Sequence, residues 1–162
     1  MDFSEIYRRY ADDVHRFSLY LSGNPTLAED LTSETFVHAL CGPAKIQAGT
    51  VKAYLFVIAR NLYRDVMARQ GRLIPIGQLP ERPDPAPSPA RAAEDRQTLT
   101  ATLRAIQRLP ELQRETLALS LDEDLTYEQI AAILGCSVAA VKVRIYRARL
   151  QLKTDLLAQE RI

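Results

Sequence analysis

A run of basic side chains near the end of the chain carries the most distinctive chemistry in this sequence. Five Lys or Arg residues and no Asp or Glu lie between positions 137 and 153: Lys142, Arg144, Arg147, Arg149 and Lys153. Lysine and arginine donate hydrogen bonds to guanine edges and to phosphate oxygens. A solvated helix face has a similar composition, so the run by itself leaves DNA binding and plain exposure to water both open.

The residues before this run predict a helix-turn-helix. Thr126 and Gln129 have the spacing of a capping box, which predicts a helix that ends before Gly135. Gly135 tolerates the positive φ of a tight turn, and Ser137 can cap a last helix over 138–157. The residues expected where the two helices cross are Ile130, Ala131, Leu134, Cys136, Val141 and Ile145.

In a DNA-binding unit of this kind, the N-terminal half of the second helix enters the major groove. Lys142 and Arg144 can bond guanine there, while alanine or valine side chains can touch a thymine methyl group. The candidate reading residues are Ser137, Ala139, Ala140, Lys142, Val143, Arg144 and Arg147. Arg147, Arg149 and Lys153 also suit phosphate contacts.

A second candidate surface lies on a helix expected over 51–71, with Val51, Leu55, Ile58 and Leu62 on its apolar stripe. Arg60, Asn61 and Arg64 share the opposite face, and the aromatic residues Tyr54, Phe56 and Tyr63 are interleaved. Basic groups beside aromatic rings suit single-stranded DNA. We expect at least one of Tyr54 and Phe56 to be a core residue instead.

Catalytic and metal chemistry finds little support. His15 and His38 lie on predicted helices without a partnered nucleophile. Cys41 and Cys136 are too few for a disulfide framework and lack metal-ligand spacing. The acidic groups Asp12-Asp13 and Asp122–Asp124 are interpreted as solvated charge. The sequence therefore predicts a binding protein with no catalytic residue, metal or cofactor.

The elements that must position these groups are all helical. Apolar residues recur at steps of three and four over about 2–21, including Val14, Phe17 and Leu21, and a second helix over 26–40 buries Leu31, Phe36 and Leu40. Six of the nine prolines lie between positions 75 and 89, where they exclude a helix. We predict an all-α fold of two small helical domains, 1–72 and 93–162, joined by a Pro-rich linker over 73–92.

Composition and charge indicate the class of protein and the kinds of partner. The chain has 162 residues, 47% hydrophobic and 25% charged, which is typical of a globular protein. Its N-terminus is acidic and no apolar run approaches the length of a membrane span, so we expect a cytoplasmic protein without membrane insertion. Residues 1–40 carry seven acids against three bases, which favours a protein partner on one face and nucleic acid on another.

Several segments resemble bacterial RNA polymerase sigma factors of the extracytoplasmic function (ECF) group. Residues 28–36 (AEDLTSETF) and 51–61 (VKAYLFVIARN) are similar to segments of the sigma-2 domain of that family. Leu109-Pro110, residues 127–131 (YEQIA) and residues 141–149 (VKVRIYRAR) are similar to sigma-4. Their order around the Pro-rich stretch is what makes the resemblance specific.

The resemblance implies roles that composition does not. It implies docking on the beta-prime clamp helices of core RNA polymerase by Asp30, Leu31, Ser33, Glu34 and Phe36. It implies binding of a melted −10 promoter element, with Asn61 near a pocket for a flipped base, by Lys45, Gln47, Arg60, Asn61 and Arg64. The 138–150 helix would read the −35 element in duplex DNA. The beta flap of the polymerase and an anti-sigma factor are the further partners it implies.

Four positions depart from the family pattern. Ser33 replaces the usual Gln, Tyr54 replaces Trp, and Ala140 and Val143 stand where Thr and Ser are common. Two other functions remain open: a dimeric helix-turn-helix regulator of duplex operators, and a helical adaptor or anti-regulator that binds only protein. The basic face over 51–71 disfavours the first, and the basic last helix disfavours the second.

Overall fold

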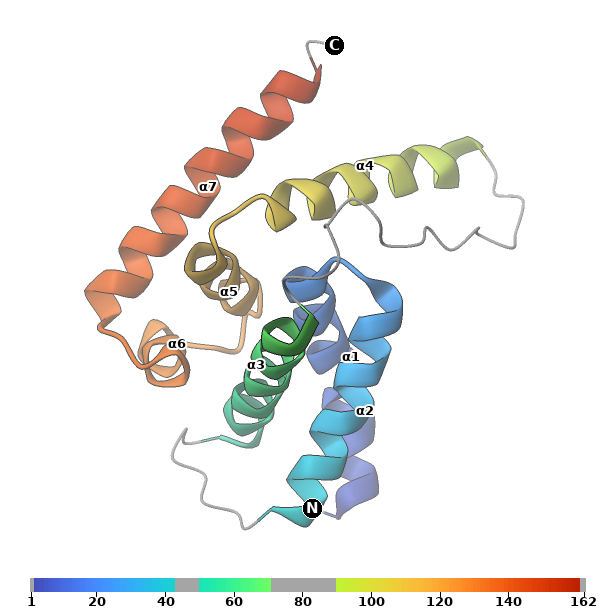
Figure 1. Cartoon of the computed structure of the whole chain (residues 1–162), viewed down its shortest axis with the longest axis vertical. Helices are drawn as coiled ribbons and strands as arrows, with labels where there is room; N and C mark the ends of the chain where they lie inside the picture. The colour runs from blue at the N-terminus through green and yellow to red at the C-terminus, as the bar shows by residue number, and fades with distance from the viewer. Residues whose placement is uncertain (1, 43–49, 71–89, 161–162) are drawn as a thin grey trace.

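Seven α-helices and no strand make up the part of the chain that the structure, a computed structural model, describes: residues 2–42, 50–70 and 90–160 (Figure 1). This confirms the predicted all-α class. The helices are α1 (Phe3–Ser22), α2 (Pro25–Cys41), α3 (Val51–Gln70), α4 (Ala90–Gln107), α5 (Glu111–Ser120), α6 (Tyr127–Leu134) and α7 (Val138–Glu160). Lys45, Gln47 and most of the predicted linker lie outside the described residues.

Local capping sets where the first three helices begin and end. Gly23 adopts a left-handed φ of 65° and its N–H bonds back to Leu19, which ends α1. The Asn24 side chain then accepts two backbone hydrogen bonds at the start of α2. Thr50 accepts the Ala53 N–H at 3.1 Å, so the cap predicted for α3 is confirmed.

The core of the first three helices uses the predicted apolar stripe of α1 but not that of α3. Of the predicted α3 stripe only Leu55 is buried, Val51, Ile58 and Leu62 are half-buried, and the buried apolar face of α3 is completed by Ala53, Phe56, Ala59 and Tyr63. Val14, Phe17 and Leu21 of α1 are at most 2% exposed, and the Phe17 ring lies 4.9 Å from the Phe56 ring of α3. Burying each such side chain contributes roughly 1.5–3 kcal/mol to folding. The expectation for Leu40 was wrong: it is 61% exposed, because the buried face of α2 continues from Thr35 to Ala39, which packs against the core, and Leu40 lies off that face.

The second half contains the predicted helix-turn-helix. Thr126 and Gln129 form the expected capping box, and Gly135 has a φ of 68°. Helices α6 and α7 meet at 96°, with Ile130, Val141 and Ile145 buried between them. One prediction is corrected here: α4 begins at Ala90, so positions 90–92 of the predicted linker are helical.

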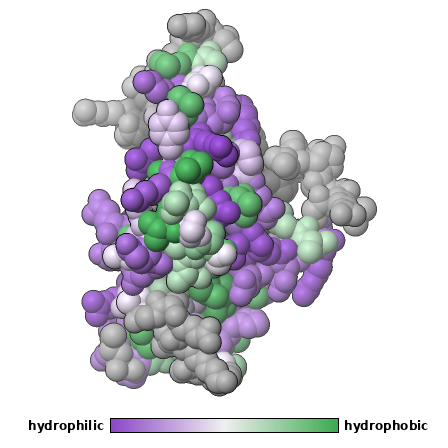
Figure 2. All heavy atoms as spheres, turned by 90° about the vertical axis from the view of Figure 1, so that its left-hand side faces the viewer, coloured by the Kyte–Doolittle hydropathy of each residue, from purple (hydrophilic) through white to green (hydrophobic). Residues whose placement is uncertain are grey.

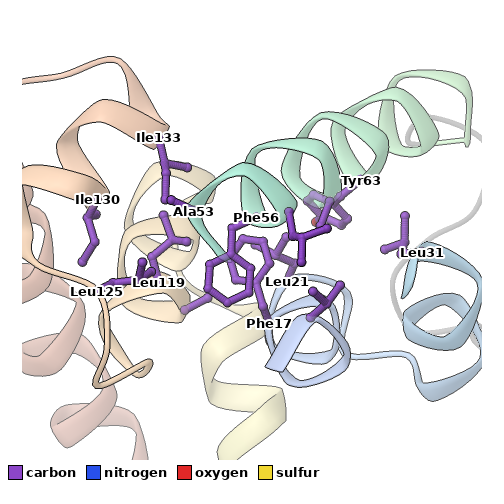
Figure 3. Packing of buried hydrophobic residues seen from close by; sticks show 14 of the residues in the cluster. Phe17, Leu21, Leu31, Ala53, Phe56, Tyr63, Leu119, Leu125, Ile130 and Ile133 are labelled. Atoms are coloured by element: carbon purple, nitrogen blue, oxygen red, sulfur yellow. The ribbon is translucent and has the colours of Figure 1, made fainter. Parts of the chain in front are cut away.

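The two halves of the chain share one hydrophobic core. Helix α1 packs against α4 and α5, and α3 packs against α6. In Figure 3 the labelled side chains run without a break from Phe17 and Phe56 to Leu119 and Ile133. The sequence predicts two domains but not this packing, which unites surfaces far apart along the chain.

Among the described residues, no single helix is long and apolar enough to cross a membrane, and the one pair that would pass by length and composition, α6 with α7, is bent by 96°.

Candidate nucleic-acid interface

The N-terminal half of α7 presents most of the predicted reading residues to solvent. Five of the seven are exposed: Ser137, Ala139, Lys142, Val143 and Arg147. On the face of the molecule that shows α6 and α7, apolar side chains lie among hydrophilic ones (Figure 2). This mixture suits a base edge, which offers both hydrogen-bonding groups and a methyl group.

Two of the predicted reading residues are constrained by local contacts. Ser137 Oγ accepts the Ala140 N–H at 3.1 Å, so the hydroxyl of Ser137 caps α7 as predicted. Arg144 is half-buried and its Nη1 donates to the Cys136 sulfur at 3.5 Å. To reach a base, the Arg144 side chain must therefore leave this weak contact with the turn.

The basic face of α3 is turned toward the second half of the chain. Arg64 donates from Nε and Nη2 to the two carboxylate oxygens of Glu115 in α5, both at 2.9 Å, and Arg60 Nε donates at 3.1 Å. Glu115 is fully buried, whereas Asn61 is exposed. The structure thus brings Arg60 and Arg64 together as predicted but pairs them with a carboxylate.

The hydrogen bond to Glu115 holds the pKa of the Arg64 guanidinium above its ordinary value. Arg60 also donates to the Ile133 carbonyl oxygen at 3.5 Å, at the end of α6. Both arginines therefore link α3 to the region that contains the helix-turn-helix.

The aromatic side chains of α3 belong largely to the core. Phe56 is 1% exposed, which confirms the expectation that at least one of Tyr54 and Phe56 packs inside. Tyr63 is 2% exposed, its hydroxyl accepts a hydrogen bond of 3.0 Å from Arg114, and burial raises its pKa. The interpretation of Tyr63 as a surface for stacking bases was therefore wrong for this arrangement, because its ring lies in the hydrophobic core and its hydroxyl binds Arg114 of α5.

A second charged cluster surrounds Lys52 at the other end of the same interface. Its ammonium lies 2.7 Å from Asp122, 2.9 Å from Asp124 and 3.2 Å from Asp13. Burial disfavours the charge of Lys52, but its hydrogen bonds to the three carboxylates hold its pKa above the ordinary value. The same bond from Lys52 lowers the pKa of Asp124.

The interpretation of these acids as solvated charge was wrong for two of them. The Asp13 and Asp122 side chains are 19% and 11% exposed and pair with Lys52. A cavity of about 360 Å³ beside them is lined by residues of α1, α3, α5 and the α5–α6 turn. Sequence analysis missed Lys52 and Glu115, because their partners lie far away along the chain and no local pattern marks them.

The residues expected to dock on polymerase divide into two groups. Asp30, Ser33 and Glu34 are exposed on α2. Leu31 and Phe36 are 1% and 2% exposed, so in this structure they fix α2 to the core. The exposed members of the predicted set are therefore acidic or polar, and Val37 and Leu40 are exposed on the same helix.

Two family descriptions match the two halves of the chain. "Sigma-70 region 2" matches residues 6–73 and "Sigma-70, region 4" matches residues 99–152. The fold and the basic helix-turn-helix thus define a sigma-70-type protein. This chain aligns with ECF sigma factors along most of their length, at more than 30% identity. The chain therefore belongs to the ECF RNA polymerase sigma factors.

Three relatives support that membership. ECF RNA polymerase sigma factor SigM of Bacillus subtilis is 34% identical over 158 residues, 94% of this chain and 94% of the relative. EcfG of Rhodopseudomonas palustris is 36% identical, over 88% of this chain and 78% of the relative. SigE of Mycolicibacterium smegmatis is 39% identical over 96% of this chain, which spans 61% of that relative's length.

Solved structures share the fold. The sigma factor RpoE of Bartonella quintana, in complex with the anti-sigma factor NepR, matches with a TM-score of 0.73 and 27% identity, over 96% of each chain. CnrH in complex with the cytosolic domain of CnrY matches with a TM-score of 0.68 and 24% identity, over 96% of this chain and 88% of that chain.

Proposed function

We propose that this protein is an alternative sigma factor that binds core RNA polymerase and directs promoter recognition, DNA melting and transcription initiation. The observation that carries the proposal is the pairing of a region 2 unit with a region 4 unit whose helix α7 presents an exposed, basic N-terminal half. Promoter recognition and DNA melting do not call for a catalytic residue, since melting needs only a site that binds unpaired bases better than paired ones.

The region 4 unit is proposed to read the −35 element. Lys142 and Arg144 can form bidentate contacts with guanine, and the exposed Val143 side chain can touch a thymine methyl. Arg147, Arg149 and Lys153 are exposed on the same helix and suit phosphates. The absence of hydroxyl groups at Ala140 and Val143 shifts sequence reading toward the basic side chains.

The region 2 unit is proposed to bind the melted −10 element. Arg60 and Arg64 would neutralise phosphates, and the exposed Asn61 would contact an extruded base. Lys45 and Gln47 are proposed to contribute from the segment before α3. This role requires Arg60 and Arg64 to exchange Glu115 for DNA.

The acidic face of α2 is proposed to dock on the beta-prime clamp helices of the polymerase through Asp30, Ser33 and Glu34. Leu31 and Phe36, buried beneath that face, would hold it in shape. A contact between the region 4 unit and the beta flap would place α7 on duplex DNA. Two weak DNA contacts joined in one chain and held on polymerase gain a high effective concentration for each other.

The proposed domain limits are 1–72 and 93–162, with the Pro-rich 73–92 segment as the connection. A relative of the same fold was solved with an anti-sigma factor, which supports the proposal that this chain is also held inactive by one. All of these partners operate in the cytoplasm, where we propose that the protein acts.

Transcription by purified core polymerase tests this function. We expect the full chain to stimulate initiation at a subset of promoters in a genomic promoter library, with defined start sites. Core polymerase alone is the control for background initiation. A chain that stimulates no promoter in the library would overturn the proposed function.

A further inference from the structure

Glu115 is a fully buried carboxylate whose two charged partners both come from the other half of the molecule. It lies on α5, whereas Arg60 and Arg64 lie on α3. The Arg64 guanidinium binds it through two parallel hydrogen bonds of 2.9 Å. This is the geometry by which arginine also binds a phosphate group.

Further polar contacts join the halves, beside the bonds of Arg114 to the Tyr63 hydroxyl and of Arg60 to the Ile133 carbonyl oxygen. Lys52 of α3 pairs with Asp122 and Asp124 after α5. At the opposite end Gln107 of α4 donates to the Tyr20 carbonyl oxygen at 2.7 Å, close against Gly23. We call the packing of residues 2–42 and 50–70 against residues 90–160 the closed arrangement. It is held at both ends by polar groups, with Glu115 between them.

Such contacts favour reversible closure. A buried ion pair gains Coulomb energy but loses the hydration of both ions, so its net contribution to stability is small. When the halves separate, water can solvate Glu115 and both arginines again. The ion pairs therefore specify how the halves fit without locking them together.

We propose that this packing is an autoinhibitory contact, in which Glu115 occupies on Arg60 and Arg64 the place of the phosphates of single-stranded promoter DNA. The inference rests on the proposed function for the identity of the DNA. One set of guanidinium N–H groups cannot hold the carboxylate and a phosphate at once. DNA binding by α3 and closure are therefore mutually exclusive.

The expected effect follows from competition between the two states. If only the open molecules bind DNA through α3, the apparent affinity equals the affinity of the open state multiplied by the fraction of molecules that are open. A substitution that weakens closure and leaves Arg60 and Arg64 intact should therefore tighten DNA binding. Loss of an acidic residue also raises the net charge, so each variant needs a control with the same charge change.

Two variants weaken closure at different places. Glu115→Gln keeps the shape of the side chain and removes its charge. The double variant Asp122→Asn with Asp124→Asn removes the two charged partners of Lys52 in the second half of the chain. Lys52 lies near the start of α3, before Arg60 and Arg64 in the same helix. The amide oxygen that this variant places at position 122 can still accept the hydrogen bond from the backbone N–H of position 124. The matched controls are Glu128→Gln and the pair Glu123→Gln with Glu128→Gln, since both glutamates are exposed.

Binding is measured on the full chain by fluorescence anisotropy, with a labelled single-stranded DNA of random sequence, about 20 nucleotides long. We expect Glu115→Gln to bind about tenfold more tightly than wild type, and the Asp122/Asp124 double variant at least about threefold. The controls should change affinity by less than about twofold. Equal gains in variants and controls, or no gain in either variant, would overturn the inference.

Closure itself is read from the distance between nitroxide labels on Cys41 of α2 and on Ala132→Cys of α6, with Cys136→Ser. Both positions are exposed and lie on different halves. We expect a narrow distribution of distances in the labelled protein without further changes, and a broader one when Glu115→Gln or the Asp122/Asp124 double substitution is added to it. Broadening with unchanged DNA affinity would overturn the inference, because closure would then not mask the arginines.

The two proposals fail in different ways. A chain that stimulates core polymerase, while its opened variants bind DNA no more tightly, overturns the autoinhibitory contact alone. A chain whose opened variants bind DNA more tightly, but which stimulates no promoter, overturns the proposed function and leaves the masking of Arg60 and Arg64 in place.

Discussion

Glu115 and Arg64 are joined by two parallel hydrogen bonds of 2.9 Å although 51 residues separate them in the chain. Arg64 is also a residue that the resemblance to sigma factors assigns to the −10 element. One side chain thus has two competing anionic partners, a carboxylate within the protein and a phosphate on DNA. The predictions below test the surfaces on which this competition depends.

Arg144→Ala should weaken binding to a −35 duplex selectively, by about 1–3 kcal/mol, because a bidentate guanine contact is lost. The measurement is the affinity for a cognate duplex and for an unrelated duplex at the same salt concentration. Arg147→Ala is the comparison, since loss of a phosphate contact should weaken both duplexes equally. An equal effect of Arg144→Ala on both would make Arg144 a phosphate contact.

Asn61→Ala should impair promoter opening without weakening polymerase binding. Asn61 is exposed on α3, and its side chain carries both donors and an acceptor for an unpaired base edge. A fluorescent base analogue in the −10 element reports opening, and co-purification with core polymerase reports assembly. Unchanged opening of a duplex template would refute the assignment.

Gly135→Ala should destabilise the helix-turn-helix. Gly135 has a φ of 68°, where an L side chain is strained although no atom lies within 4 Å of the added methyl group. We expect a loss of roughly 1 kcal/mol and a melting temperature lower by about 3 °C. Gly135→Asn is the control, because asparagine tolerates this conformation and should lose less. Equal melting temperatures for all three proteins would contradict the account of the turn.

The contact between Lys52 and Asp124 should weaken in acid. Lys52 lowers the pKa of Asp124, so the stabilisation is present above the unfolded-state pKa of an aspartate and is lost as pH falls through the lower folded-state pKa. Denaturant unfolding at about pH 7 and about pH 3 measures the loss. Asp124→Asn should show a smaller loss than wild type, while Glu128→Gln should match wild type. A loss that Asp124→Asn leaves unchanged would contradict this pairing.

The sequence predicts the local structure well, because its signals are local. Thr126, Gln129 and Gly135 mark the helix-turn-helix within ten residues, and the observed ends of α6 follow them. The contacts between the halves carry no such signal. Glu115 and Lys52 meet partners in the opposite half that lie 51 to 72 residues away, and an isolated charge gives no sign of its distant partner.

The errors at individual residues have the same origin. Tyr63 lies among basic residues on α3, so its pattern favours a surface role, but its ring packs in the hydrophobic core and Arg114 binds its hydroxyl. Leu40 fits the apolar spacing of α2, yet the buried face of that helix continues from Thr35 to Ala39 and leaves Leu40 exposed at its edge. Helical periodicity identifies a face and does not tell how far its covering extends.

The most direct test of the central claim compares the affinity of the chain for one promoter duplex, chosen from those it activates, with and without core polymerase. The account predicts weak, salt-sensitive binding by the chain alone, and binding at least about a hundredfold tighter, specific to that promoter, when polymerase aligns the two DNA-binding surfaces. Binding to the duplex that is equally tight and specific without polymerase would contradict the account and favour a self-standing operator-binding regulator.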